Sequence, residues 1–169
     1  MSLTSETTLT RWRGWSPAAA RLLRWAPLTL ALAGMGISAY LGFVHYSGVP
    51  LYCTGAGGCH TVQSSQYATL VGVPVSLLGF VLYAAIFAAG LLALRGSAAG
   101  DAAALLTFGM ALSGVLYSGY LTWLELYRIY AICAWCVTSA GLLSGIFVLS
   151  GADVVLSARW RRLGQNQDG

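Results

Sequence analysis

Charge is what this sequence has least of. Lysine is absent, and charged residues together make up 8% of the chain, against about 25% in an ordinary soluble domain. The stretches 25–94, 102–124 and 129–152 contain no Asp, Glu, Lys or Arg. A soluble domain carries charged side chains over much of its surface. The scarcity of charge therefore excludes an ordinary soluble fold.

Hydrophobic residues, at 57% of the chain, fill the charge-free stretches. The two later stretches are each long enough to cross a hydrocarbon core about 30 Å thick, and the first holds two crossings and a neutral loop. We therefore expect an all-α integral membrane protein, a four-helix transmembrane bundle whose extracytoplasmic end is capped by a loop. The predicted helices cover about 27–46, 74–94, 102–126 and 132–149.

The basic residues, all of them arginine, predict the orientation of this bundle. Four lie in residues 1–24, one in the connection 95–101 and three in residues 153–169. Positive charge accumulates on the cytoplasmic side of a membrane. We expect a multi-pass protein of the cell inner (plasma) membrane, with basic cytoplasmic tails at 1–24 and 153–169 and the membrane domain at 25–152. The net charge of +4 belongs to these membrane edges, so it does not indicate nucleic-acid binding.

The first outer loop, residues 47–73, is rich in glycine, serine and threonine. Within it, Thr61–Leu70 is predicted to form a short amphipathic helix on the membrane surface. The loop also contains Cys53 and Cys59, while Cys133 and Cys136 form a Cys-Ala-Trp-Cys motif at the outer end of the fourth helix. All four cysteines thus fall on the extracytoplasmic side, where disulfides persist, although the orientation argument used no cysteine.

A Cys-x-x-Cys motif at a helix N-terminus favours a thiolate, because the helix dipole and free N–H groups stabilise negative charge there. The thiolate is the attacking species in thiol–disulfide exchange. Cys136, one turn deeper than Cys133, is expected to meet a lipid-soluble oxidant at the bilayer edge. Two alternatives stay open on these residues alone. One is a non-catalytic scaffold with two structural disulfides, and the other is a zinc site, with all four cysteines as ligands or with His60 in place of one thiolate.

Four motifs resemble the vitamin K epoxide reductase family, and specifically its bacterial quinone-linked members. The resemblance covers about residues 27–149. Its motifs are Cys53…Cys59, Val62-Gln63-Ser64-Ser65, the run Gly72-Val73-Pro74-Val75-Ser76-Leu77-Leu78-Gly79, and Cys133-Ala134-Trp135-Cys136. The DsbB-type enzymes, which also have four helices, place their Cys-x-x-Cys before the wider pair, the reverse of the order here.

The resemblance implies a membrane thiol oxidase that supports disulfide-bond formation, with a role for each cysteine. Cys53 and Cys59 look like the pair that takes electrons from a partner thiol. Cys133 would exchange with this pair, through Cys53, and Cys136 would face a bound quinone. Ser65 matches a family serine or threonine that forms a hydrogen bond near the active site; a helix cap or a solvated hydroxyl is its alternative reading.

The resemblance also implies a cofactor and a partner. The cofactor is a quinone, menaquinone or ubiquinone, and no metal is expected. The partner is a separate thioredoxin-fold (DsbA-like) dithiol protein, since the chain stops after Gly169 without the thioredoxin-like domain of some bacterial members. Val75 and Ala140 stand where animal members carry Asn and Tyr, which favours quinone reduction; a vitamin K epoxide or quinone reductase proper is the alternative.

The outer end of the third helix carries most of the remaining distinctive side chains. Its aromatic residues fit an interfacial belt, with a quinone pocket as a second use for some of them. The two charged residues there, spaced i and i+3, are expected to pair at the surface. The aromatic residues are Tyr117, Tyr120, Trp123, Tyr127 and Tyr130, and the charged pair is Glu125 and Arg128.

Overall fold

The structure is a computed structural model that describes residues 17–50, 58–70, 72–95 and 98–165. Four long helices dominate it, and each contains a segment long and apolar enough to cross a membrane. This confirms the prediction of an all-α membrane bundle. The long helices are α2 (Pro17–Ser47), α4 (Val75–Ala93), α5 (Ala98–Leu124) and α6 (Ala134–Gln165).

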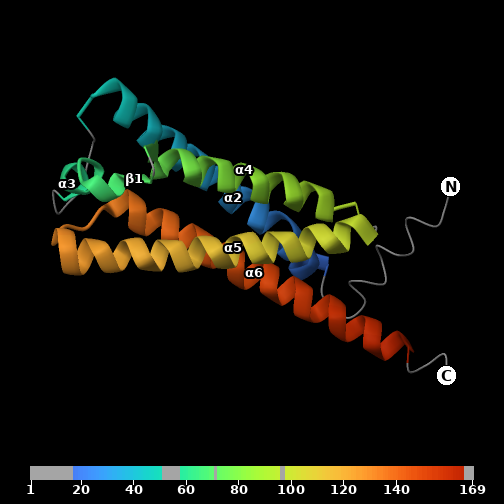
Figure 1. The fold of residues 1–169 in the computed structure, drawn as a ribbon. Helices are drawn as coiled ribbons and strands as arrows, with labels where there is room; N and C mark the ends of the chain where they lie inside the picture. The colour runs from blue at the N-terminus through green and yellow to red at the C-terminus, as the bar shows by residue number, and fades with distance from the viewer. Residues whose placement is uncertain (1–16, 51–57, 71, 96–97, 166–169) are drawn as a thin grey trace.

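The long helices form a closed ring in which each packs against two neighbours, in the order α2, α4, α5, α6. Figure 1 shows an elongated bundle with the start of α2 and the end of α6 toward one end and the short elements α3 and β1 at the other. The core between the helices is built from Ala31, Tyr83, Ile86, Ala111 and Ile146. Gly34 makes the crossing of α2 and α4 possible, because any Cβ there would overlap the ring of Tyr83.

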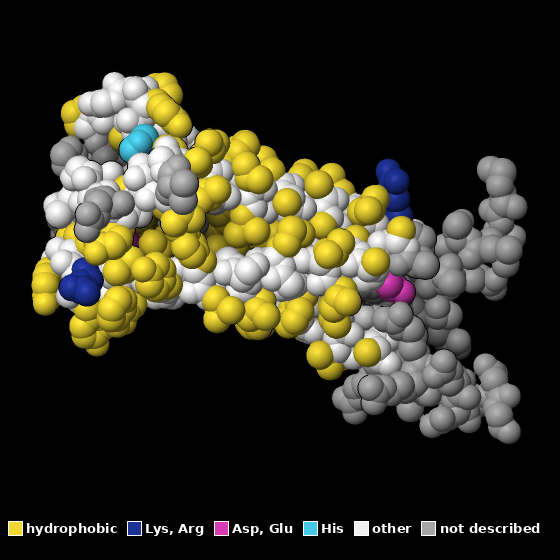
Figure 2. Space-filling view, viewed as in Figure 1, with side chains coloured by type: hydrophobic (Ala, Val, Ile, Leu, Met, Phe, Trp, Pro, Cys, Tyr) yellow, Lys and Arg dark blue, Asp and Glu magenta, His cyan; other side chains and the backbone are white. Residues whose placement is uncertain are grey.

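The outer surface of the bundle is apolar along its length. Large hydrophobic side chains are exposed on every long helix, among them Leu32, Val81, Leu116 and Val148. Figure 2 shows hydrophobic side chains along the flank, while the charged side chains seen in this view lie toward its two ends. This distribution is what a hydrocarbon environment requires of a helix bundle.

The predicted helix boundaries differ most from the structure at the start of the first helix and at the end of the fourth. The first helix begins at Pro17, so the last part of the predicted tail 1–24 is helical, and α6 continues to Gln165 through most of the predicted tail 153–169. Hydropathy marks where a helix leaves the hydrocarbon, whereas backbone hydrogen bonding continues as long as the residues favour it. The apolar segments themselves, Trp25–Ser47 and Ala134–Ala158, lie closer to the predicted spans.

The predicted surface helix over Thr61–Leu70 is wrong. The structure has a five-residue helix, α3 (Cys59–Gln63), then a 3₁₀ turn, η1 (Gln66–Ala68), and a two-residue antiparallel pair, β1 (Thr69–Leu70) with β2 (Val73–Pro74). The hydroxyls of Ser64 and Ser65 donate to the carbonyls of Thr61 and Val62 at 3.3 and 2.7 Å. Serine side chains that bond to the nearby backbone in this way compete with helix continuation.

Candidate functional site

A π-helical turn ends α5 and shapes the site. The turn, η2 (Glu125–Ile129), is followed by Tyr130 in the left-handed conformation at φ 54°. The Ala131 N–H closes it by donating to the Glu125 carbonyl at 3.2 Å. A π turn holds one more residue than an α turn, and such turns occur frequently at functional sites. Here the turn brings the chain back so that Cys133 lies over Glu125.

Cys133 and Cys136 lie where the sequence predicted, at the start of α6. Cys133 immediately precedes Ala134, the first residue of the helix, and its carbonyl accepts the N–H of Val137 at 3.0 Å. Both are free thiols; Cys133 is buried and Cys136 is half-buried. The pKa of Cys133 is lowered, chiefly by a hydrogen bond with the Cys136 side chain, while burial and the nearby Glu125 carboxylate act in the opposite direction. Of the two, Cys133 is thus the one whose thiolate form is favoured.

Glu125 faces these thiols, and the predicted surface pair with Arg128 is therefore wrong. Its side chain is only 3% exposed, and its Oε2 accepts the backbone N–H of Cys133 at 3.1 Å. It is also hydrogen-bonded with the Cys136 side chain. Arg128 is exposed. The i, i+3 rule assumes α-helical geometry, whereas both residues belong to the π turn.

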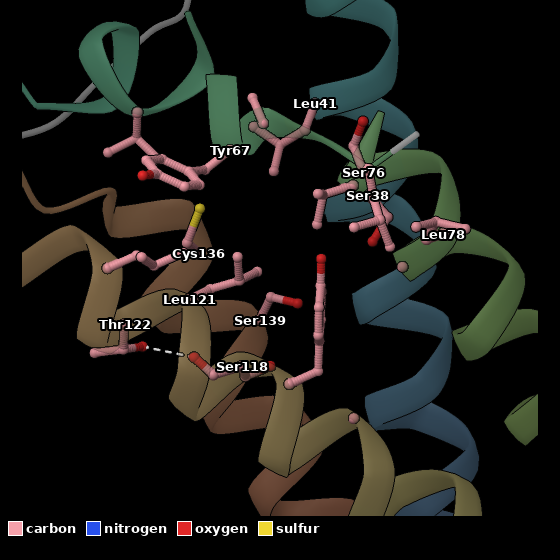
Figure 3. Close-up of a pocket in the computed structure, with 18 of the residues that line it drawn as sticks. Ser38, Leu41, Tyr67, Ser76, Leu78, Ser118, Leu121, Thr122, Cys136 and Ser139 are labelled. Carbon is pink, nitrogen blue, oxygen red and sulfur yellow. Dashed lines mark hydrogen bonds between the residues drawn. The ribbon is translucent and has the colours of Figure 1, made fainter. Parts of the chain in front are cut away.

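A cavity of about 380 Å³ opens beside Cys136, between the long helices and under the segment that contains η1. Figure 3 shows the Cys136 sulfur pointing from α6 toward the Tyr67 ring, with Leu41, Ser38 and Ser76 across the cavity. Most of the lining is apolar, from residues such as Leu41, Leu78 and Leu121. A mostly apolar molecule with a few hydrogen-bonding groups fits such a lining.

The polar groups of the cavity come mainly from serine and tyrosine. The Tyr83 hydroxyl donates to the Ser139 carbonyl at 2.8 Å and lies 3.0 Å from the Ser139 hydroxyl. The Ser76 hydroxyl is buried and, within the described part of the chain, has no hydrogen-bond partner. Sequence reasoning did not single out Ser38, Ser76, Tyr83 or Ser139. The available signal was that polar side chains inside membrane helices tend to face a functional cavity.

Ser65 and Val75 line the same cavity as Cys136. Ser65 thus lies near the thiols, yet its hydroxyl is occupied by the Val62 carbonyl, which is what ends α3. Its role in the chemistry stays a prediction. Val75 presents an aliphatic side chain where animal family members were expected to carry an amide.

The first loop contacts the segment just before Cys133. A Cβ added to Gly58 would lie 2.8 Å from both the nitrogen and the oxygen of Ile132, so only glycine allows this approach. The next residue, Cys59, is fully buried and disulfide-bonded. Cys53 and the His60 side chain lie outside the described residues, and the predictions for them are not tested. The described part of the loop nevertheless contacts the segment just before Cys133, the residue with which the loop cysteines were predicted to exchange.

The aromatic side chains at the thiol end of the bundle fall into two groups, one lining the cavity and the other exposed. Tyr117 lines the cavity, while Tyr120, Trp123, Tyr127 and Tyr130 are exposed. The exposed four have the surroundings expected of an interfacial belt. Tyr117 instead contributes to the wall beside the thiols.

Comparison with known proteins relates this arrangement to one family. The chain is 32% identical over 127 residues to the thiol-disulfide oxidoreductase LTO1 of Arabidopsis thaliana; the match covers 70% of this chain but 33% of the relative, so the chain spans about a third of its length. The profile of the vitamin K epoxide reductase family matches residues 25–151. That range includes all four cysteines and nearly all of the four apolar segments. The chain belongs to the vitamin K epoxide reductase family.

Proposed function

We propose that this protein is a quinone-dependent membrane thiol oxidase that oxidises the dithiol of a separate thioredoxin-fold protein. The observation that carries the proposal is the position of Cys136, half-buried at the start of α6 and lining a mostly apolar cavity within the bundle. A thiol in that place meets a lipid-soluble oxidant. The relationship to a thiol-disulfide oxidoreductase supports the same class of reaction.

The reaction proceeds as two exchanges and one redox step. The partner's dithiol reduces the Cys53–Cys59 disulfide, and the reduced loop pair then reduces the Cys133–Cys136 disulfide. Two electrons and two protons finally leave the Cys133 and Cys136 thiols for the quinone, which becomes quinol as the disulfide forms again. Cys59 is disulfide-bonded while Cys133 and Cys136 are free. In the proposed relay, that combination would precede the reduction of the quinone.

The cavity fits a quinone in size and chemistry. Its volume of about 380 Å³ lies in the range of small-molecule sites. A quinone ring is flat and apolar, and its two carbonyl oxygens accept hydrogen bonds. The buried Ser76 hydroxyl has a proton to donate and no partner among the described residues. An unpaired buried hydroxyl is costly, and a quinone carbonyl would satisfy it.

The proposal is tested with purified, detergent-solubilised protein, a reduced thioredoxin-fold substrate and either ubiquinone or menaquinone. We expect substrate thiols to disappear and quinol to appear in equal amounts, at a rate that depends on both the protein and the quinone. A chelator should leave the rate unchanged, which separates the relay from a metal site. Thiol loss without quinol formation would contradict the proposal.

Ser76→Ala is expected to raise KM for quinone by up to about tenfold and to change kcat little, since one hydrogen bond contributes about 0.5–1.5 kcal/mol. Steady-state quinol formation measures this. Ser144→Ala is the matched control, because that exposed hydroxyl donates only to the Ala140 carbonyl of its own helix, at 2.9 Å. Equal KM values in both variants would show that Ser76 does not contact the quinone.

We further propose that the membrane is the cell inner (plasma) membrane and that the thiol end of the bundle is extracytoplasmic. Two single-cysteine additions test the orientation in a background whose native cysteines are replaced by serine. They are Thr61→Cys in α3 and Ala99→Cys in the first turn of α5; both positions are exposed, at opposite ends of the bundle. A membrane-impermeant maleimide should label Thr61→Cys in intact spheroplasts and Ala99→Cys only after lysis. The reverse pattern would overturn the orientation.

A further inference from the structure

Glu125 is a buried acidic residue at the site that takes no part in the thiol–disulfide exchange steps. Glu125 is only 3% exposed, and it is one of two glutamates in the chain, the other being Glu6. A buried carboxylate within a membrane bundle is costly and is usually functional. Glu125 accepts a hydrogen bond from the Cys133 N–H at 3.1 Å. A neutral acceptor such as an amide oxygen would make that bond equally well.

The contacts of Glu125 place it between the thiols and the cavity. It touches Cys133 through the backbone and Cys136 through the side chain, and it lines the same cavity as Cys136. The Cys136 side chain is hydrogen-bonded with it, and the charge of Glu125 acts on both thiols. Tyr67 of η1, Tyr83 of α4 and Tyr117 of α5 line the cavity as well, whereas the cavity residues from α2, Ser38 and Leu41, do not titrate.

We propose that Glu125 is the proton-transfer residue of the quinone step: its carboxylate takes the Cys136 thiol proton and passes it to a quinone oxygen. This rests on the proposed function and extends it to a specific group. General acid–base catalysis requires a base within hydrogen-bonding reach of the proton that moves, and Glu125 meets that condition. The π turn is what points the carboxylate inward.

The step balances in electrons and protons. Cys133 and Cys136 lose one electron each as their sulfurs join, and the quinone gains both. One proton travels from the Cys136 sulfur to Glu125 and then to the quinone, which returns Glu125 to its carboxylate. The second proton reaches the quinol from the Cys133 thiol or, where Cys133 is already a thiolate, from solvent.

Glu125→Gln tests the proposal, because glutamine keeps the acceptor for the Cys133 N–H but takes up no proton. The quinone half-reaction, followed in a single turnover from the reduced protein, should slow by about a hundredfold. Exchange between the loop pair and Cys133–Cys136, measured without quinone, should change much less, because that half-reaction delivers no proton to a quinone. Asp101→Asn is the matched control, since it removes the acidic residue in the first turn of α5, at the far end of the bundle.

The pH profile separates proton transfer from a structural role. In the wild type the quinone half-reaction should slow as pH falls, because protonated Glu125 accepts no proton. In the wild type the rate should level off once Glu125 is ionised, whereas the rate of the Gln variant should lack that plateau and keep rising with pH, since Cys136 must then lose its proton to solvent base. Equal rates in the Gln variant and the wild type, or an equal loss in both half-reactions, would overturn the proposal.

A spectroscopic measurement decides the question if the Gln variant does not fold. With ¹³C-labelled glutamate in a Glu6→Gln background, the infrared carboxyl signal belongs to Glu125 alone. That signal should convert from carboxylate to carboxylic acid over the pH range in which the quinone half-reaction slows. A conversion outside that range would overturn the role of Glu125. A wild-type protein that does not reduce quinone at all would overturn the proposed function itself.

Discussion

Cys136→Ser is expected to lower quinone-dependent oxidation by at least about a thousandfold, the order of loss seen when a residue that takes part directly in the chemistry is removed. Cys136 lines the cavity proposed for the quinone, and without its sulfur the disulfide that forms in the redox step cannot close. The shape of the site should be retained, because a serine hydroxyl is close to a thiol in size. Quinol formation with a small artificial dithiol measures the loss.

Cys59→Ser is the matched control for this experiment. It belongs to the loop pair, and a small dithiol that reaches the Cys133–Cys136 disulfide directly bypasses that pair. We expect Cys59→Ser to retain most of the small-dithiol activity and to lose activity with the thioredoxin-fold partner. If both variants lost small-dithiol activity equally, the two pairs would not act in the proposed order.

The bundle was predictable from the sequence because its signals are long and additive. Charge-free stretches such as 102–124 exceed the length needed to cross a membrane, so a few ambiguous residues do not change the result. The place of Cys133 and Cys136 at the outer end of the fourth helix followed from the same pattern. Helix ends were less predictable, as at Pro17 and Gln165, because hydropathy reports the membrane boundary and not the end of backbone hydrogen bonding.

The interior of the site was not predictable in the same way. The prediction for Glu125 assumed an α-helix, and the π turn rotates that side chain from the surface to the thiols. The residues of this turn carry no pattern that distinguishes it from a continued α-helix. Ser76 is the one serine of α4 and Ser139 is one of four in α6, and only the packing of the helices shows that both line the same cavity. Local pattern thus located the thiols, while the groups around them depend on tertiary contacts.

The first loop contacts the segment that leads into α6, and this contact indicates which cysteines exchange. The close approach of Gly58 to Ile132 places Cys59 next to the segment that leads into Cys133. Three of the five residues between Cys53 and Cys59 are glycine, a residue that adopts a wide range of backbone conformations. We therefore propose that Cys53, which lies outside the described residues, reaches Cys133; the two Cα atoms must come within about 7 Å for a disulfide.

Cys59→Ser is expected to convert most of the protein to a Cys53–Cys133 crosslink during turnover with the thioredoxin-fold partner. Cys53 attacks Cys133, which breaks the Cys133–Cys136 disulfide and leaves Cys136 as a free thiol. In the wild type, Cys59 then attacks Cys53 and releases Cys133; without Cys59 the crosslink persists. Mass spectrometry after non-reducing digestion should find the peptide pair, and Cys53→Ser, which lacks the attacking sulfur, should not form it. A crosslink from Cys53 to Cys136, or no crosslink, would show that the order of exchange is different.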